Sequence, residues 1–323
     1  MSERYYYAVA RTAELENKLL SRAKLEQLTE ASDAPSALKA LSGTVYAESA
    51  DVLQKPEEFE GMLTAQTRAV LSYIREVCPD KALADLYLIA YDIFNLKVLL
   101  RCEKLGEDPA RLMSALGIYE PPMLRDAFED GDFSKYPHAV GEAVAAVRKA
   151  LSAGSSVSVI DLTLDRAQYT AQSEYAKKCR NDFIRNYVRV SIDLANLRDF
   201  LRTRTGGRGA FYAVFIEGGT LPVEFFDDCF DSTDALSKKL GFTSYAGLSK
   251  SAGEGDLTAF ERDCDDYLTE TVRAGKKIAF GPELLMGYVA AKLTEIAQLR
   301  IILVGKINGM RPEVIRQRLR QLF

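Results

Sequence analysis

The sequence has only one histidine, His138, and no tryptophan among its 323 residues. A single imidazole excludes a zinc site built on several histidines and most catalytic arrangements that pair a nucleophile with a histidine base. The five cysteines are scattered without CxxC spacing, which indicates reduced thiols and neither a disulfide framework nor a thiolate metal site. The motifs GxSxG, HExxH and GxxxxGK[ST] are also missing. The sequence therefore predicts a protein that is not an enzyme and has no cofactor, metal ion or bound nucleotide.

Basic residues are not in excess, and no apolar run is long. The 42 lysines and arginines face 46 acidic residues, so nucleic acid is not an expected partner. The two richest apolar stretches, 86–100 and 289–304, are interrupted by charged residues and fall short of the roughly 20 apolar residues of a spanning helix. No secretory signal is visible at the start of the sequence. Any membrane association is therefore expected to be peripheral.

One segment of the sequence occurs three times. The copies are residues 91–101, 192–202 and 294–304, which align without gaps. Each copy has a carboxylate, an amide and a cation in the same three columns: Asp92, Asn95 and Lys97; Asp193, Asn196 and Arg198; Glu295, Gln298 and Arg300. Glycines share a later column at Gly106, Gly207 and Gly309, spaced 101 and then 102 residues apart. A period this long exceeds the roughly 20–50 residues of a solenoid repeat. It indicates a small domain present three times.

The apolar residues of each copy recur at helical spacing. The stripe contains Leu96, Leu197 and Leu299, which we expect to be buried. A weaker repeat, Ser32–Gly43 with Tyr46 and Ser232–Gly241 with Tyr245, reads as short capped helices that end at glycine. Strand-forming runs are scarce: residues 155–160 are the one candidate strand, and they could equally begin a helix.

We therefore predict an all-α fold of three similar helical domains with pseudo-threefold symmetry. Their predicted boundaries are 1–108, 109–208 and 209–323. The glycine-rich segment 206–222, with aromatic residues inside it, is expected to be a hinge-like connection between copies.

Two interpretations of the repeated polar columns are open. In the first, the carboxylate and the amide lie on neighbouring helical turns and bond to adjacent parts of the same domain. In the second, three equivalent helices line one surface and present Lys97, Arg198 and Arg300 to a partner. We favour the first, because internally repeated residues usually hold a repeated fold together.

The two ends of the sequence resemble a known family. The segments that carry the likeness are Gly281–Gly309, Pro312–Arg320, Tyr5–Arg11 and Glu14–Arg22. They resemble the C subunit of V/A-type ATPases, the counterpart of the eukaryotic d subunit, and with the repeats the likeness spans essentially the whole chain.

The resemblance implies a funnel-shaped, all-helical and non-catalytic subunit of an ATP-driven ion-translocating complex. It implies a peripheral position on the cytoplasmic face of the membrane, on the proteolipid ring, where the funnel accepts the central stalk of the D and F subunits. Such a subunit transmits torque during ion transport or ATP synthesis. The alternative from the residues alone is a free cytosolic helical scaffold that binds a peptide or protein partner.

Overall fold

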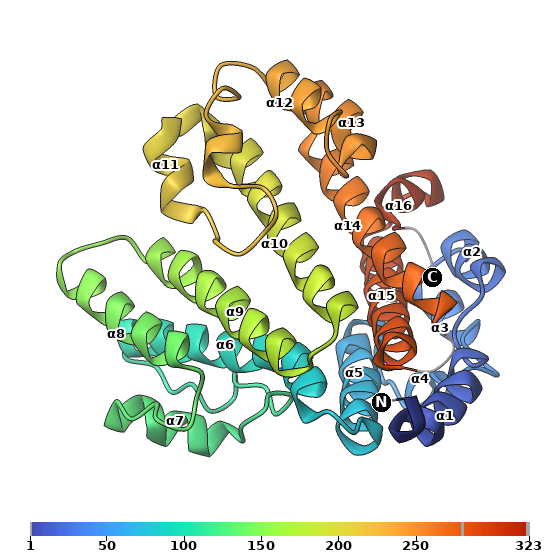
Figure 1. Cartoon of the computed structure of the whole chain (residues 1–323). Helices are drawn as coiled ribbons and strands as arrows, with labels where there is room; N and C mark the ends of the chain where they lie inside the picture. Colours follow the sequence, from blue (N-terminus) through green and yellow to red (C-terminus); the bar gives the residue numbers. More distant parts are fainter. Residues whose placement is uncertain (1, 279–280, 321–323) are drawn as a thin grey trace. The chain divides into compact units, whose positions relative to one another are not determined.

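The computed structural model describes residues 2–278 and 281–320, and none of these residues lies in a strand. The prediction of an all-α protein is confirmed. The chain divides into two compact units, the first made of Met1–Pro79 with Arg262–Phe323 and the second of Asp80–Glu261 (Figure 1). The predicted division into three domains at 108 and 208, their pseudo-threefold symmetry and the funnel shape stay predictions.

The first unit is built on the long helix α15, Pro282–Ile307. Segments from both ends of the sequence pack on it: α1, α2, α3, α5 and α16 (Figure 1). The other elements of the unit are η1 Ser2–Tyr5, α1 Tyr6–Glu16, α2 Arg22–Glu30, α3 Ala34–Lys39, α4 Ala47–Asp51, η2 Pro56–Glu58, α5 Phe59–Val77, η6 Ala274–Lys277 and α16 Pro312–Arg318. The helix α14, Leu257–Arg273, contains residues of both units.

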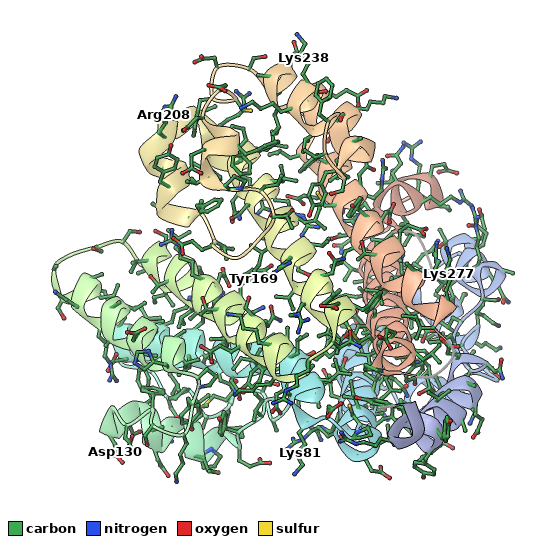
Figure 2. The ribbon with its side chains drawn as sticks, in the orientation of Figure 1. Lys81, Asp130, Tyr169, Arg208, Lys238 and Lys277 are labelled. Atoms are coloured by element: carbon green, nitrogen blue, oxygen red, sulfur yellow. The ribbon has the colours of Figure 1, made fainter. Side chains whose placement is uncertain are left out.

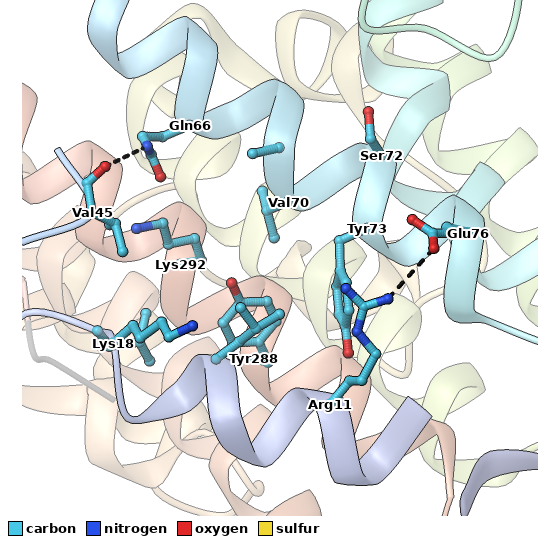
Figure 3. Close-up of a pocket in the computed structure, with 13 residues that line it drawn as sticks. Arg11, Lys18, Val45, Gln66, Val70, Ser72, Tyr73, Glu76, Tyr288 and Lys292 are labelled. Carbon is cyan, nitrogen blue, oxygen red and sulfur yellow. Dashed lines mark hydrogen bonds and ion pairs between the residues drawn. The ribbon is translucent and has the colours of Figure 1, made fainter. Parts of the chain in front are cut away.

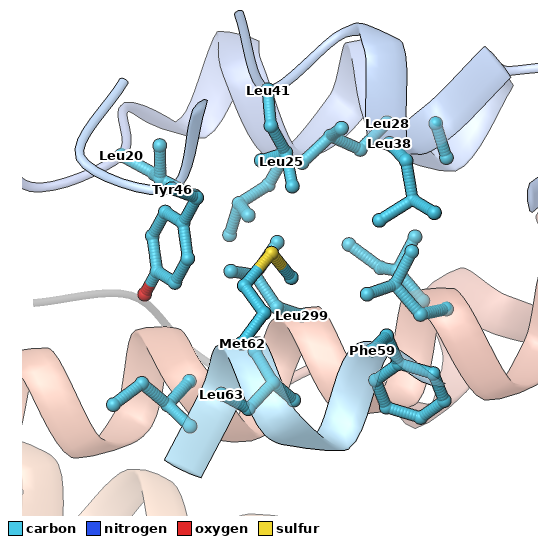
Figure 4. Packing of buried hydrophobic residues seen from close by; sticks show 14 of the residues in the cluster. Leu20, Leu25, Leu28, Leu38, Leu41, Tyr46, Phe59, Met62, Leu63 and Leu299 are labelled. Carbon is cyan, nitrogen blue, oxygen red and sulfur yellow. The ribbon is translucent and has the colours of Figure 1, made fainter. Parts of the chain in front are cut away.

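The core of the first unit joins α2, α3, α5 and α15 (Figure 4). Leu28, Leu41, Leu63 and Leu299 are fully buried there. Burying a leucine side chain contributes about 1.5–3 kcal/mol, so this core stabilises segments that lie far apart in the sequence.

The second unit contains two long helices that carry the repeat, α6 and α10, and both pack on α9. Its elements are α6 Lys81–Leu105, α7 Pro121–Asp130, α8 His138–Ser152, α9 Ser158–Lys178, α10 Asp182–Thr203, η3 Arg204–Gly206, α11 Gly207–Val214, η4 Val223–Phe226, α12 Thr233–Leu240, η5 Ala246–Leu248 and α13 Ser249–Glu254. The predicted stripe residues Leu96 and Leu197 are fully buried, which confirms the helical stripe.

The two predicted short helices and their N-terminal caps are confirmed. The helix α12 ends at its C-cap Gly241 as predicted, whereas α3 ends at Lys39, before Gly43. Asp33 accepts a hydrogen bond from the Ser36 amide at the start of α3, and Ser232 accepts one from the Asp234 amide at the start of α12. Each satisfies an amide that the helix itself leaves unpaired. The three column glycines all have positive φ, between 64° and 81°. At Gly106 this left-handed residue ends α6, as glycine allows.

The structure also tests two expectations about local structure, the candidate strand at 155–160 and the hinge at 206–222. Residues 158–160 begin the helix α9, so the candidate strand is absent. The segment expected to be a hinge contains the helix α11, and its Phe211 is fully buried. The Phe211 ring lies 5.1 Å from Phe200 and 4.7 Å from Phe226, centroid to centroid. This aromatic packing anchors α11. Arg208, labelled in Figure 2, lies on the same helix. It forms an ion pair with Asp227.

Candidate functional site

The repeated polar residues lie near the middle of the three long helices. We call them the α6 cluster, the α10 cluster and the α15 cluster after the helix that carries each. The carboxylate and amide side chains of all three clusters are almost completely buried: Asp92, Asn95, Asp193, Asn196, Glu295 and Gln298. A buried carboxylate is costly unless hydrogen bonds or a cation compensate it. The partners of each carboxylate therefore decide what the cluster does.

In the α10 cluster, Asp193 accepts hydrogen bonds from four groups. The amides of Thr220 and Leu221 donate at 2.9 Å, and the Thr220 hydroxyl donates at 2.5 Å. The fourth donor is the hydroxyl of Tyr245, at 2.6 Å from Oδ2. Short bonds of this kind to an ionised acceptor are stronger than neutral ones. Asp193 thus joins α10 to two later segments of the same unit.

In the α6 cluster, Asp92 accepts from the amides of Ile118 at 3.0 Å and Tyr119 at 3.3 Å. The residue before these donors, Gly117, approaches the carboxylate so closely that a Cβ there would lie 2.8 Å from Asp92 Cγ. Gly219 stands in the same relation to Asp193, with a Cβ distance of 2.9 Å to Cγ. The backbone reaches both carboxylates because these residues lack side chains.

In the α15 cluster, Glu295 accepts from the amide of Leu20, 275 residues earlier in the sequence. The hydroxyl of Tyr46 and the ammonium of Lys292 each donate to it at 2.6 Å. Lys292 is only 4% exposed, and burial lowers its pKa although the Glu295 carboxylate opposes that shift. Burial and the same carboxylate raise the pKa of Tyr46, so its hydroxyl remains a donor at neutral pH.

Each amide side chain pairs with the backbone of one residue 19 to 22 positions later. The side-chain amide group donates a hydrogen bond to that residue's backbone carbonyl and accepts one from its backbone N–H. The pairs are Asn95 with Ser114 at 2.8 and 2.7 Å, Asn196 with Ile216 at 2.7 and 2.8 Å, and Gln298 with Arg320 at 2.5 and 3.1 Å.

Two cations of the third column, Lys97 and Arg300, form ion pairs with carboxylates of neighbouring helices. Lys97 lies 2.6 Å from Asp165 on α9, and Arg300 holds both oxygens of Glu60 on α5 at 2.7 and 2.9 Å. The Arg300–Glu60 pair is exposed, whereas Lys97 is mostly buried. Arg198 is half-buried on α10. The nine residues predicted from the sequence thus form three similar clusters, one on each long helix.

The geometry of the clusters suits structural connection better than chemistry. The carboxylates face donors of their own chain, and in the described part of the chain no three histidine, cysteine or acidic side chains are grouped as metal ligands. His138 is exposed and pairs with Glu142 on the next turn of α8.

Three participants have no assigned role in the sequence analysis: Tyr46, Tyr245 and Lys292. The tyrosines follow the two similar short helices, and each is held by a threonine two residues before it. Thr44 and Thr243 donate to the carbonyl of the residue three positions earlier, Leu41 and Leu240, and accept from the amide of the tyrosine at 3.2 Å and 3.0 Å. The signal that could have identified them is this shared Thr-x-Tyr pattern. Lys292 has no such signal, because the equivalent residues in the other copies are Ile89 and Val190.

Comparison with known proteins connects this architecture to one family. The family described as ATP synthase (C/AC39) subunit matches residues 8–318, nearly the whole chain. The chain belongs to the ATP synthase (C/AC39) subunit family. This establishes the family that the ends of the sequence resemble.

Relatives of the C/AC39 family match along most of their length. The C subunit of the V-type sodium ATPase of Enterococcus hirae is 26% identical over 317 residues, which cover 95% of each chain. The C subunit of the A-type ATP synthase of Methanocaldococcus jannaschii is 26% identical, with 97% of this chain and 85% of the relative covered. The C subunit of the V-type ATP synthase of Thermus thermophilus is 24% identical over 94% of each chain. As a C/AC39 family member, this chain is a C subunit of the V/A-type ATPases and a component of such a complex.

Within residues 2–278 and 281–320, no helix has both the length and the apolar content needed to cross a bilayer.

Proposed function

We propose that this C/AC39 family member is a non-catalytic part of the central stalk of a V/A-type rotary ATPase or ATP synthase. In this role it couples the stalk of D and F subunits to the membrane proteolipid ring, peripherally on the cytoplasmic face. The observation that carries the proposal is the family match over residues 8–318, together with a relative that is named as a C subunit and is covered to 95%.

A coupling protein has to pass torque without bending, and the buried clusters support that requirement. Well-packed protein interiors deform little, and satisfied polar networks fix one arrangement of the helices around them. Asp193 and Glu295 each join a long helix to two further segments. We propose that the carboxylate and amide columns serve this internal stiffness in all three repeats.

Arg300 is the cation of the repeat that we assign to a partner contact. Arg300 and Glu60 are both about half exposed, and an exposed pair of this kind stabilises a protein by only about 0–1 kcal/mol. A carboxylate of a partner protein could therefore replace Glu60 at little cost. Polar contacts of this kind set the orientation and rate of association more than its strength.

The experiment is a pull-down of the tagged chain from gently solubilised membranes, with the co-purifying proteins identified by mass. Stalk D and F subunits, catalytic subunits and proteolipid in one eluate are the expected result. An eluate of this chain alone, while the intact ATPase stays in the unbound fraction, would reject the proposal. A second pull-down with Arg300→Gln, compared with the exposed control Arg125→Gln on α7, tests the cation column. Only the first is expected to lower the yield of partner subunits.

A further inference from the structure

The first unit contains a pocket of about 310 Å³ between α1, α5 and α15 (Figure 3). We call it the α1–α5–α15 pocket. Its walls are largely apolar and include Leu15 and Val70, and its polar lining is mainly cationic, with Arg11, Lys18 and Lys292 against the single carboxylate Glu76.

The hydroxyl of Tyr288 lies in this pocket without a hydrogen-bond partner among the described residues. The side chain is only 6% exposed, and its ring packs edge-on against Tyr73 with the centroids 5.6 Å apart. Buried tyrosine hydroxyls normally bond to a partner. Burial raises the pKa of Tyr288 to about 12, so the group is a hydrogen-bond donor at neutral pH.

Lys292 provides a second donor in the same pocket. An ammonium group has three N–H bonds, and two of them are engaged, with the Tyr46 hydroxyl at 3.1 Å and Glu295 Oε1 at 2.6 Å. The third has no acceptor in the part of the chain that the structure describes. Lys292, Lys18 and Tyr288 all line this pocket (Figure 3).

We propose that the α1–α5–α15 pocket binds a carboxylate carried on a short apolar stem. The two donors from Tyr288 and Lys292 match the two oxygens of one carboxylate, and the apolar walls match the stem. Lys18 is half exposed and pairs with Glu14 of α1, while Arg11 lies 3.4 Å from Glu76. These exposed pairs are weak, so both cations remain able to attract an anion. The proposal is independent of the coupling function.

The carboxylate can come from a free small acid or from the C-terminal end of a polypeptide with an apolar last residue. Both present the same chemistry to Tyr288 and Lys292. The experiment therefore includes a probe for each source.

The first measurement is saturation-transfer NMR on the full chain with hexanoate, compared with hexanol. Transfer from the protein to hexanoate, with at least about tenfold weaker binding of hexanol, is expected because the alcohol loses the charge that the two donors recognise. Equal binding of hexanol and hexanoate overturns the proposal. This comparison uses the unaltered protein, so it does not depend on the folding of a variant.

The second measurement repeats the hexanoate titration with Tyr288→Phe and with Tyr73→Phe. The first removes the unpartnered hydroxyl and keeps the ring, so affinity should fall about tenfold. The second is the matched control, because the Tyr73 hydroxyl is already bonded to Thr12 at 2.8 Å and to the Ala8 carbonyl. Unchanged affinity in a folded Tyr288→Phe protein overturns the assignment of this donor.

The third measurement replaces hexanoate by the peptide acetyl-Gly-Gly-Leu with a free C-terminus or with a C-terminal amide. Tighter binding of the free peptide than of hexanoate identifies a protein end as the source, and the reverse identifies a small acid. Either result supports the carboxylate site. Failure of hexanoate and of the free peptide to bind overturns it.

Discussion

The α10 cluster and the α15 cluster reach nearly the same arrangement through opposite connectivity. Asp193 receives its donors from residues 27, 28 and 52 positions later, within one continuous stretch of chain. Glu295 receives the corresponding amide and tyrosine hydroxyl from residues 275 and 249 positions earlier. The comparison shows that the repeated polar residues specify how the helix packs against its donors, and not where in the sequence those donors lie. Loop-closure entropy grows only slowly with loop length, so both connections are compatible with one geometry.

The side chains of the two clusters differ in a consistent way. Both buried side chains of the α15 cluster are one methylene longer, with glutamate and glutamine where the α10 cluster has aspartate and asparagine. The residue before the donor amide is Leu19 in one case and Gly219 in the other. A longer side chain reaches a backbone that stays further away, whereas a short one requires the close approach of a glycine.

The largest effect is expected for Glu295→Ala, which leaves the buried Lys292 without its carboxylate. We expect the free energy of unfolding to fall by about 3–5 kcal/mol, measured by urea denaturation. The double variant Lys292→Met with Glu295→Gln should recover most of this loss, because no buried charge is then left unpaired. If the double variant is no more stable than Glu295→Ala, the ion pair is not what distinguishes the α15 cluster.

The next largest effect on stability is expected when the tyrosine hydroxyl of each cluster is removed. Tyr245→Phe removes one hydrogen bond to an ionised acceptor and should lower the free energy of unfolding by about 1.5–3 kcal/mol. Tyr46→Phe should cost less, because Lys292 still neutralises Glu295 and lies 4.4 Å from the Tyr46 ring centroid. Denaturant titrations of both variants test this order, and a larger loss for Tyr46→Phe would reverse the interpretation.

The glycine difference is tested by Gly219→Ala. Its Cβ would overlap the Asp193 carboxylate, so we expect a loss of about 1–3 kcal/mol in unfolding free energy. The matched control is Gly247→Ala, since a Cβ at that position in the same unit meets no atom within 4 Å. Equal stability of the two variants would show that Asp193 can move away without loss.

A smaller effect concerns a second charge on α10. Asp199 occupies the repeat column that holds Val98 on α6 and Ile301 on α15. Burial raises the pKa of Asp199 to about 6. The Asp165 carboxylate adds to this shift, and Arg202 and Arg198 oppose it. A carboxyl whose folded pKa lies above its unfolded value binds more protons when folded. Its stabilisation is complete below the unfolded value of 3.8 and is lost as the pH rises through 6. The melting temperature of Asp199→Asn should therefore fall less between about pH 4.5 and about pH 7.5 than the melting temperature of the parent protein. If the melting temperatures of the two proteins change with pH in parallel, the raised pKa of Asp199 is contradicted.

The smallest effect is expected for Arg300→Gln, because its pair with Glu60 is exposed. A loss of about 0–1 kcal/mol in unfolding free energy is expected, measured beside Glu295→Ala. A loss as large as that of Glu295→Ala would give the cation column a structural role equal to the buried columns.

Much of the fold could be predicted from neighbouring residues, and part of the site could not. The helices, their caps at Asp33 and Ser232 and the buried stripe with Leu96 and Leu197 follow from local spacing. The helix α11 could not be predicted, because the glycines of 206–222 are typical of a loop and only the packing of Phe211 against Phe200 reveals its surroundings.

The sequence by itself determined the helical class, the threefold repetition and the identity of the polar columns, because periodicity, capping and repeated residue types are written into short stretches of chain. Only the tertiary structure decided what those columns bond to. The Leu20 amide and the Tyr46 hydroxyl meet Glu295 across more than 240 residues, and Lys292 becomes buried beside them. Such partners are selected by the packing of whole helices, which must satisfy every buried polar group at once, and no local pattern contains that information.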